Sequence, residues 1–179
     1  IENSYKKIID SLGDYVDQKG VKDTPKRVAN TYEELLSGYT ADIEKIINNA
    51  LFDVEYDQIV IVKNIRFYSL CEHHILPFFG KIDIGYLPNS KIIGLSKIPR
   101  ITQVFSKRLQ VQERLTEQIG KAIFENTNAL GAGVVINAQH MCTSMRGVNM
   151  PSTEMVTSSL FGTFKSDDAT RKEFFDLIK

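Results

Sequence analysis

DQIVIVKNIRFY, SLCEHHILP and GKIDIGYL, at residues 57–68, 69–77 and 80–87, make up the stretch of sequence that decides the fold. The first segment is rich in Ile, Val, Phe and Tyr, and in the last segment Ile82, Ile84 and Tyr86 alternate with polar or small residues. Both patterns are typical of β-strands, and the polar segment between them predicts a turn. Strands joined this closely predict a hairpin, which is a feature of antiparallel sheets.

Segments with helical spacing flank this hairpin on both sides. Upstream, we predict a helix over residues 2–18, a second helix that starts at Asp23-Thr24-Pro25 and ends at Ser37-Gly38, and a short helix near 42–50. Downstream, we predict helices over 98–109 and 111–126, strands over 133–143 and 154–164, and a last helix over 167–178. The order β-β-α-α-β-β predicts an α+β fold, because the strands are not separated one by one by helices. The change of character at residue 53 predicts an N-terminal helical segment, 1–53, and a second domain, 54–179.

Composition excludes several classes of protein. The chain has 179 residues, 42% of them hydrophobic, with 22 basic and 22 acidic side chains. A net charge of zero argues against nucleic-acid binding, which usually requires a clustered basic excess, but a local group of cations would still suit a small anionic ligand. The apolar runs are too short to cross a membrane, and no secretory signal is visible. The two cysteines could in principle pair, but their neighbours in the sequence argue against it, so we interpret them as reduced thiols and expect a cytoplasmic location.

The cysteines and histidines point to a metal site. The chain has three His and two Cys, and all five lie in Cys71-Glu72-His73-His74 and His140-Met141-Cys142. Thiolate and imidazole ligands together suit Zn²⁺. If residues 133–143 form a strand, His140 and Cys142 point to the same side of it. Four ligands would make a structural site, whereas three ligands would leave a position for water and a histidine free for proton transfer.

Three polar segments could hold a substrate. Gly94-Leu95-Ser96-Lys97-Ile98-Pro99-Arg100 predicts a helix start surrounded by Ser96, Lys97 and Arg100, which suits a phosphate group. Arg146, four residues after Cys142, could hold an anion beside the metal. A carboxylate in Gln110-Val111-Gln112-Glu113-Arg114 could accept two hydrogen bonds from a guanine edge. Solvated helix residues would give the first and third patterns equally well.

Together these segments resemble the GTP cyclohydrolase I family. The resemblance covers residues 20–165 and rests on the following segments: Asp23-Thr24-Pro25 with Arg27, CEHHILPF (71–78), GLSK (94–97), RLQVQERLT (108–116), His140-Met141-Cys142 and MRGV (145–148). It implies a tunnelling fold, which is a four-stranded antiparallel sheet with two backing helices. It also implies hydrolysis of GTP to dihydroneopterin triphosphate, with release of formate, in a toroidal homodecamer whose active sites lie between subunits.

The resemblance also implies a role for each site residue. Cys71, His74 and Cys142 would bind Zn²⁺, with water at the fourth position, and His73 and His140 would transfer protons. Glu113, with Gln112 nearby, would hold the guanine. Ser96, Lys97, Arg100 and Arg146 would hold the triphosphate and ribose, Ser96 and His73 would assist ribose opening, and Arg27 would act from a neighbouring subunit. No regulatory protein partner is indicated.

Two alternatives remain open at this stage. A relative with the same fold, the nitrile-reducing enzyme of queuosine synthesis, is an NADPH-dependent oxidoreductase with a cysteine nucleophile and no catalytic zinc. A zinc-stabilised binding module that retains GTP recognition is the second alternative. Formation of a fluorescent pterin from GTP distinguishes the expected hydrolase from both.

Overall fold

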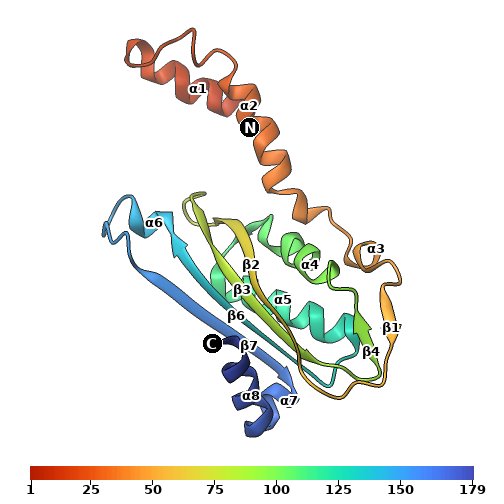
Figure 1. Cartoon of the computed structure of the whole chain (residues 1–179). Coiled ribbons are helices and arrows are strands. Elements are labelled where there is room, and N and C mark those ends of the chain that lie inside the picture. Colours follow the sequence, from red (N-terminus) through yellow and green to blue (C-terminus); the bar gives the residue numbers. More distant parts are fainter.

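A twisted sheet with helices on both faces forms the body of the molecule in the computed structural model, which describes residues 1–179 (Figure 1). The strand order is β5-β2-β3-β6-β7. The strands are β2 (Val60–Cys71), β3 (Pro77–Leu87), β5 (Leu109–Gln110), β6 (Gly131–His140) and β7 (Glu154–Gly162). The four long strands pair antiparallel as predicted, and β5 adds a two-residue parallel pairing to β2. The fold is therefore α+β, as expected.

The β2–β3 hairpin is longer than the sequence pattern predicts. Pairing continues to Leu70 opposite Pro77, so the turn contains only residues 72–76. A proline is tolerated here because it stands at the first position of its strand. The longer pairing places Cys71 at the end of a regular strand, which fixes the direction of its side chain.

Two helices, α4 (Lys97–Ser106) and α5 (Gln112–Thr127), cover one face of the sheet. Alternate residues of the strands point toward them, and Ile82, Ile84 and Ile136 are fully buried in the shared core. On α5, Leu115, Ile119 and Ile123 recur at helical spacing and are also fully buried. This burial explains why the helix pair packs here, because its apolar stripe and the apolar face of the sheet cover each other.

The C-terminal helices α7 (Thr163–Ser166) and α8 (Asp168–Ile178) pack near the opposite face of the sheet. Phe174 is fully buried there, and side chains at Gly85 and Gly133 would overlap its ring, because a Cβ atom would lie 2.7 Å and 2.9 Å from it. Glycine at these two positions makes the room that α8 needs.

The N-terminal segment forms an arm that projects from the body (Figure 1). It contains α1 (Glu2–Leu12), a 3-10 turn (Gly13–Tyr15) and α2 (Thr24–Leu35), which starts at the predicted Asp23-Thr24-Pro25. The first helix ends earlier than predicted, because Gly13 adopts a positive φ of 53°.

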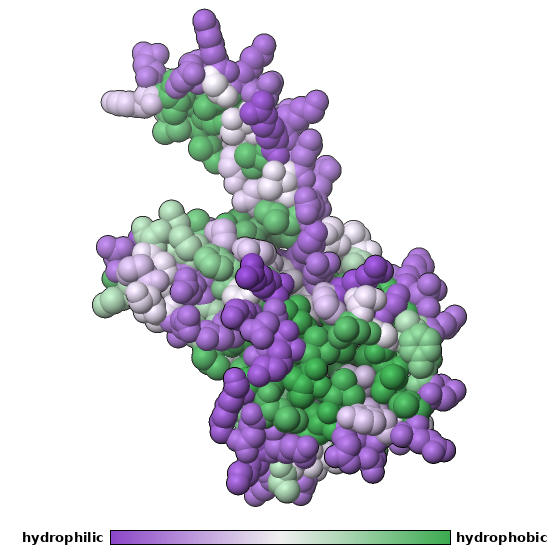
Figure 2. Space-filling view, viewed as in Figure 1, coloured by the Kyte–Doolittle hydropathy of each residue, from purple (hydrophilic) through white to green (hydrophobic).

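The predicted division at residue 53 stays a prediction, and the elements just before it pack on the body. Ile47 of α3 (Ile43–Ile47) belongs to the core, and β1 (Leu51–Asp53) pairs with β4 (Lys91–Ile93). Figure 2 shows a hydrophobic area on this side of the body. An apolar groove of about 360 Å³ there is lined by Phe52, Val60, Val62, Tyr86, Ile92, Ile93, Gly94, Leu95 and Ile98.

The predicted strand over 133–143 is wrong at its C-terminal end. Strand β6 ends at His140, and Met141–Ser144 form a single helical turn, α6. No helix of the chain is both long enough and apolar enough to span a membrane.

Candidate active site

The turn between β2 and β3 is closed by backbone hydrogen bonds around Cys71. The Cys71 amide donates to Leu76 O at 2.9 Å, and the Ile75 amide donates to Cys71 O at 2.8 Å. Ile75 has a positive φ of 54°, which is unusual for a β-branched residue and indicates backbone strain in the turn. The turn thus holds His73 and His74 in a tight loop directly after Cys71.

Three ligand atoms, from Cys71, His74 and Cys142, lie within 4.8 Å of one another. Cys71 is buried, Cys142 is half-buried and His74 is exposed, so the group opens toward solvent on the histidine side. The Cys71 Sγ is 3.9 Å from Nδ1 of both His73 and His74, and both cysteines are free thiols. Two thiols and one imidazole at this separation match the ligand set and the open geometry of a catalytic zinc site.

Cys142 reaches this group from α6 and not from a strand. The expectation that alternation along a strand would place His140 and Cys142 on one side is therefore wrong. The backbone turns into α6 directly after His140, and this turn directs the two side chains to different partners. Burial and the neighbouring Cys71 raise the pKa of the Cys142 thiol, and the charge of Arg146 opposes this shift. A bound cation would favour the thiolate instead.

The imidazole of His140 contacts the ring of Phe78 and the side-chain amide of Gln112. Its imidazole stacks on Phe78 with a centroid separation of 4.7 Å and an interplanar angle of 5°. Its Nε2 is 2.8 Å from Oε1 of Gln112. Burial lowers the pKa of His140, and the carboxylate of Glu113 acts in the opposite direction. His140 is therefore a half-buried, oriented imidazole that is not part of the three-ligand group.

Gln112 lies in the interior, although the resemblance implied that it contacts guanine. It is 1% exposed, and its amide group bonds to main-chain and side-chain atoms of β6 and β7 as well as to His140. Glu113, the next residue, is exposed in the first turn of α5. It lines an open groove of about 450 Å³ together with Glu117 and residues of β7. Of these two neighbours, only Glu113 has an exposed side chain.

Three of the residues predicted to bind phosphate, Ser96, Lys97 and Arg100, lie at the N-terminal end of α4. The metal ligands lie beyond its C-terminal end. Ser96 precedes the helix and Lys97 begins it, whereas the segment after the helix approaches Cys71 through pairing with Gln110. The ten residues of α4 span about 15 Å. Lys97 Nζ donates to Ile46 O at 2.8 Å, and Arg100 lines a cavity of about 200 Å³ beside residues 37–46. One chain does not bring this group to the metal ligands.

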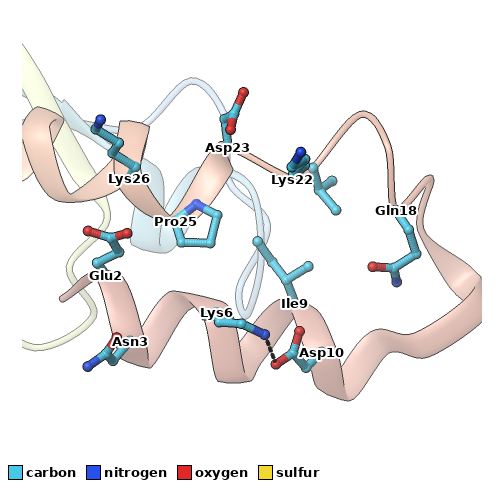
Figure 3. A pocket seen from close by; sticks show the side chains of 11 residues that line it. Glu2, Asn3, Lys6, Ile9, Asp10, Gln18, Lys22, Asp23, Pro25 and Lys26 are labelled. Atoms are coloured by element: carbon cyan, nitrogen blue, oxygen red, sulfur yellow. Dashed lines mark hydrogen bonds and ion pairs between the residues drawn. The ribbon is translucent and has the colours of Figure 1, made fainter.

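Arg27 lies on the arm, with its side chain 74% exposed and only a 3.9 Å contact to Asp23. A groove of about 440 Å³ separates α1 from the start of α2, and Figure 3 shows its charged and polar lining, including the Lys6–Asp10 ion pair. This groove includes none of the predicted site residues. Arg146 is exposed in the loop after α6, close enough to Cys142 to influence its thiol.

Two residues of the site have structural roles that their sequence positions do not indicate. Arg114 forms a two-point ion pair with Glu72, with N–O distances of 2.5 Å and 3.1 Å, and thereby ties the turn to α5. This contact lowers the pKa of the Glu72 carboxyl. Phe78 supplies the surface on which His140 stacks. Both residues lie inside the segments that carry the family resemblance, but neither an exposed arginine nor a core phenylalanine indicates such a role by itself.

Comparison with known proteins gives a consistent result. The family model described as GTP cyclohydrolase I matches residues 1–179. The protein named GTP cyclohydrolase 1 of Leptospira biflexa is 51% identical over 100% of this chain and 98% of its own length. That of Campylobacter jejuni strain 81-176 is 50% identical over 99% of this chain and 93% of its own length. Among solved structures, the archaeosine synthase QueF-Like in the apo form shares 13% identity over 58% of this chain and 93% of its own, with a TM-score of 0.48.

Proposed function

The chain belongs to the GTP cyclohydrolase I family of hydrolases, and from this premise we propose that it hydrolyses GTP at C8 of the purine ring. Formate leaves, and the remaining ribosyl pyrimidine rearranges to 7,8-dihydroneopterin triphosphate. The observation that supports this reaction best is the Cys71–His74–Cys142 group beside an oriented His140. This arrangement would combine a metal site with an imidazole that is not a metal ligand.

We propose Zn²⁺ as the metal. The donor set fits this ion, because two thiolates and one imidazole favour zinc over magnesium or calcium and three protein ligands leave one position open. A bound zinc ion would activate water for attack near neutral pH. Cys71 and Cys142 would supply the charge that retains the ion, and His74 would be the third protein ligand.

The two remaining histidines would transfer protons. His140 would protonate the imidazole ring of the purine, because it lies close to Glu113, the residue proposed to hold the base. His73, exposed in the turn, would act with Ser96 in opening the ribose. General acid–base catalysis of this kind typically contributes about 100- to 10,000-fold to a rate.

Glu113 would bind the N1–H and the exocyclic amine of guanine, since it is exposed on a helix turn beside His140. Arg146 would hold the ribose or phosphate end near the metal. Ser96, Lys97, Arg100 and Arg27 would act on the site of a neighbouring copy, because one chain keeps them away from its own metal ligands. This arrangement fits a homo-oligomer, for which we propose a decamer, in the cytoplasm.

A turnover assay tests the function. The zinc-loaded protein is incubated with GTP, formate is measured, and pterin fluorescence is followed after oxidation. ATP is the matched control, because its base lacks the paired donors that Glu113 would bind. We expect formate and pterin from GTP only. Absence of both products with zinc present would overturn the proposal and favour a binding module, provided that GTP still binds.

A further inference from the structure

Gln112 connects His140 to two neighbouring strands. It is the first residue of α5 and is 1% exposed. Its Nε2 lies 3.1 Å from Ile136 O on β6 and 2.8 Å from Met155 O on β7. Both carbonyl oxygens only accept hydrogen bonds, so the side-chain NH₂ must point toward them. The reverse orientation would place an amide oxygen against two carbonyl oxygens.

A chain of hydroxyl groups supports the same orientation. Thr116 Oγ1 donates to Gln112 O at 2.7 Å, so the hydrogen between the Thr116 and Thr157 hydroxyls, 2.7 Å apart, comes from Thr157. Thr157 Oγ1 is then an acceptor for Gln112 Nε2 at 3.1 Å. The two hydrogens of the Gln112 NH₂ thus face three acceptors, and Oε1 of Gln112 is left to face His140.

The consequence concerns the proton on His140. An amide oxygen can only accept, so Nε2 of His140 must carry the hydrogen in the 2.8 Å contact. This holds for the neutral and for the charged ring. Phe78 fixes the plane of the same ring by stacking on it. Nδ1 is then the nitrogen of the neutral His140 ring that carries no hydrogen.

We propose that Gln112 is a positioning residue that fixes the ring of His140 and holds it as the Nε2–H tautomer. This inference rests on the proposed role of His140, and it replaces a guanine contact by Gln112, which the sequence resemblance implied. Guanine recognition on this helix then belongs to Glu113 alone. The network acts through His140 and does not touch the substrate.

The first test is spectroscopic and needs no variant of Gln112. The zinc-loaded protein is labelled with ¹³C and ¹⁵N in histidine, and solid-state NMR of the ring atoms reports the tautomer. Only three histidines are present, and comparison with a His140→Ala sample assigns the signals of His140. We expect the Nε2–H form. A neutral His140 with its hydrogen on Nδ1 would overturn the inference, whatever the activity of the protein.

The second test separates positioning from guanine binding. Gln112→Met keeps the length of the side chain and removes both polar atoms. We expect kcat to fall by about 10-fold or more, while the Kd for GTP changes by less than about 3-fold and zinc remains stoichiometric. A weakened Kd with an unchanged kcat would instead identify Gln112 as a guanine contact. An unchanged kcat and Kd would also overturn the proposal.

Thr127→Val is the matched control for the loss of a buried polar group on α5. Thr127 is 1% exposed and its hydroxyl donates to Ile123 O at 2.7 Å, at the end of the helix away from His140. The Thr127→Val variant should retain the kcat of the wild type. If the wild-type protein itself forms no pterin, the proposed function fails, but the NMR result still decides which nitrogen of His140 carries the hydrogen.

Discussion

Two groups of proposed site residues differ in whether a single chain brings them together. They are the Cys71–His74–Cys142 group and the residues Ser96, Lys97 and Arg100 at the start of α4. Cys71, His74 and Cys142 converge through a closed hairpin turn and a short helix of the same chain. Along α4, Ser96 stands about 15 Å and Arg100 about 9 Å from the helix end that leads toward Cys71. The proposed metal ligands therefore come together within one chain, whereas the proposed phosphate-binding residues do not join them there, which is why we propose that they act on a neighbouring copy.

Removing one ligand should have the largest effect on the metal group. We expect Cys142→Ala to lose zinc and activity together, because two ligands do not retain the ion, and metal analysis measures the loss. His140→Ala serves as its counterpart. It should keep zinc and GTP binding while activity falls by about 100- to 10,000-fold. Stoichiometric zinc in Cys142→Ala, or full activity in His140→Ala, would refute the respective assignment.

Mixed oligomers test whether the cations act on another copy. Arg100→Ala should weaken GTP binding by about 10- to 100-fold, the usual effect of losing a hydrogen bond to a charged group. Co-expression of Arg100→Ala with His140→Ala should then give more activity at low GTP than either variant alone, because some sites combine two intact halves. Activity equal to the sum of the separate variants would place both residues in the site of one chain.

The Arg114–Glu72 ion pair should influence the metal group only through the turn. Arg114→Ala releases the turn from α5, and we expect zinc affinity to fall by about 10-fold, as when an outer partner of a metal ligand is removed. Arg114→Lys retains the charge and should lie between this variant and the wild type. Competition with a zinc chelator measures the affinity, and an unchanged affinity in Arg114→Ala would show that the turn holds its shape without α5.

The smallest effect is expected from relieving strain in the turn. Ile75 has a positive φ of 54°, which asparagine tolerates better. Ile75→Asn should therefore stabilise the protein by about 1 kcal/mol, measured by denaturant unfolding. Val148→Asn is the control, because this exposed residue is not among those with positive φ. A loss of stability in Ile75→Asn alone would mean that contacts of the isoleucine outweigh the strain.

The hairpin and the helix pair could be predicted because they depend on patterns within the sequence. Alternation around Ile82 and Ile84 identifies a strand, and spacing from Leu115 to Ile123 identifies a helix. The end of β6 could not be predicted. The segment after Val134 remains compatible with a strand up to residue 143, and only the folded chain shows that the backbone turns into α6 at Met141.

The residue types of the site could be predicted from the sequence, but the hydrogen-bond partners of these residues could not. The gathering of every Cys and His into two short segments is a signal that the sequence carries by itself, and it points to a metal. The role of Gln112 depends on carbonyl groups of Ile136 and Met155, which become its neighbours only when α5 packs on the sheet. In sequence, a polar residue whose hydrogen bonds are made by distant main-chain atoms cannot be distinguished from one that is free to bind a ligand.

The pairing register of β3 and β6 sets a limit on how this site can change in evolution. Phe78 stands directly opposite His140, so the stacked pair exists only while both strands keep their lengths. Inserting one residue into β6 would turn every side chain beyond it to the opposite face, and His140 would leave both Phe78 and Gln112. Insertions in the loop at residues 145–153 leave this register untouched. The part of that loop beyond Arg146 can therefore change in length without moving the stacked pair or the proposed contact of Arg146, whereas the strands beside it cannot.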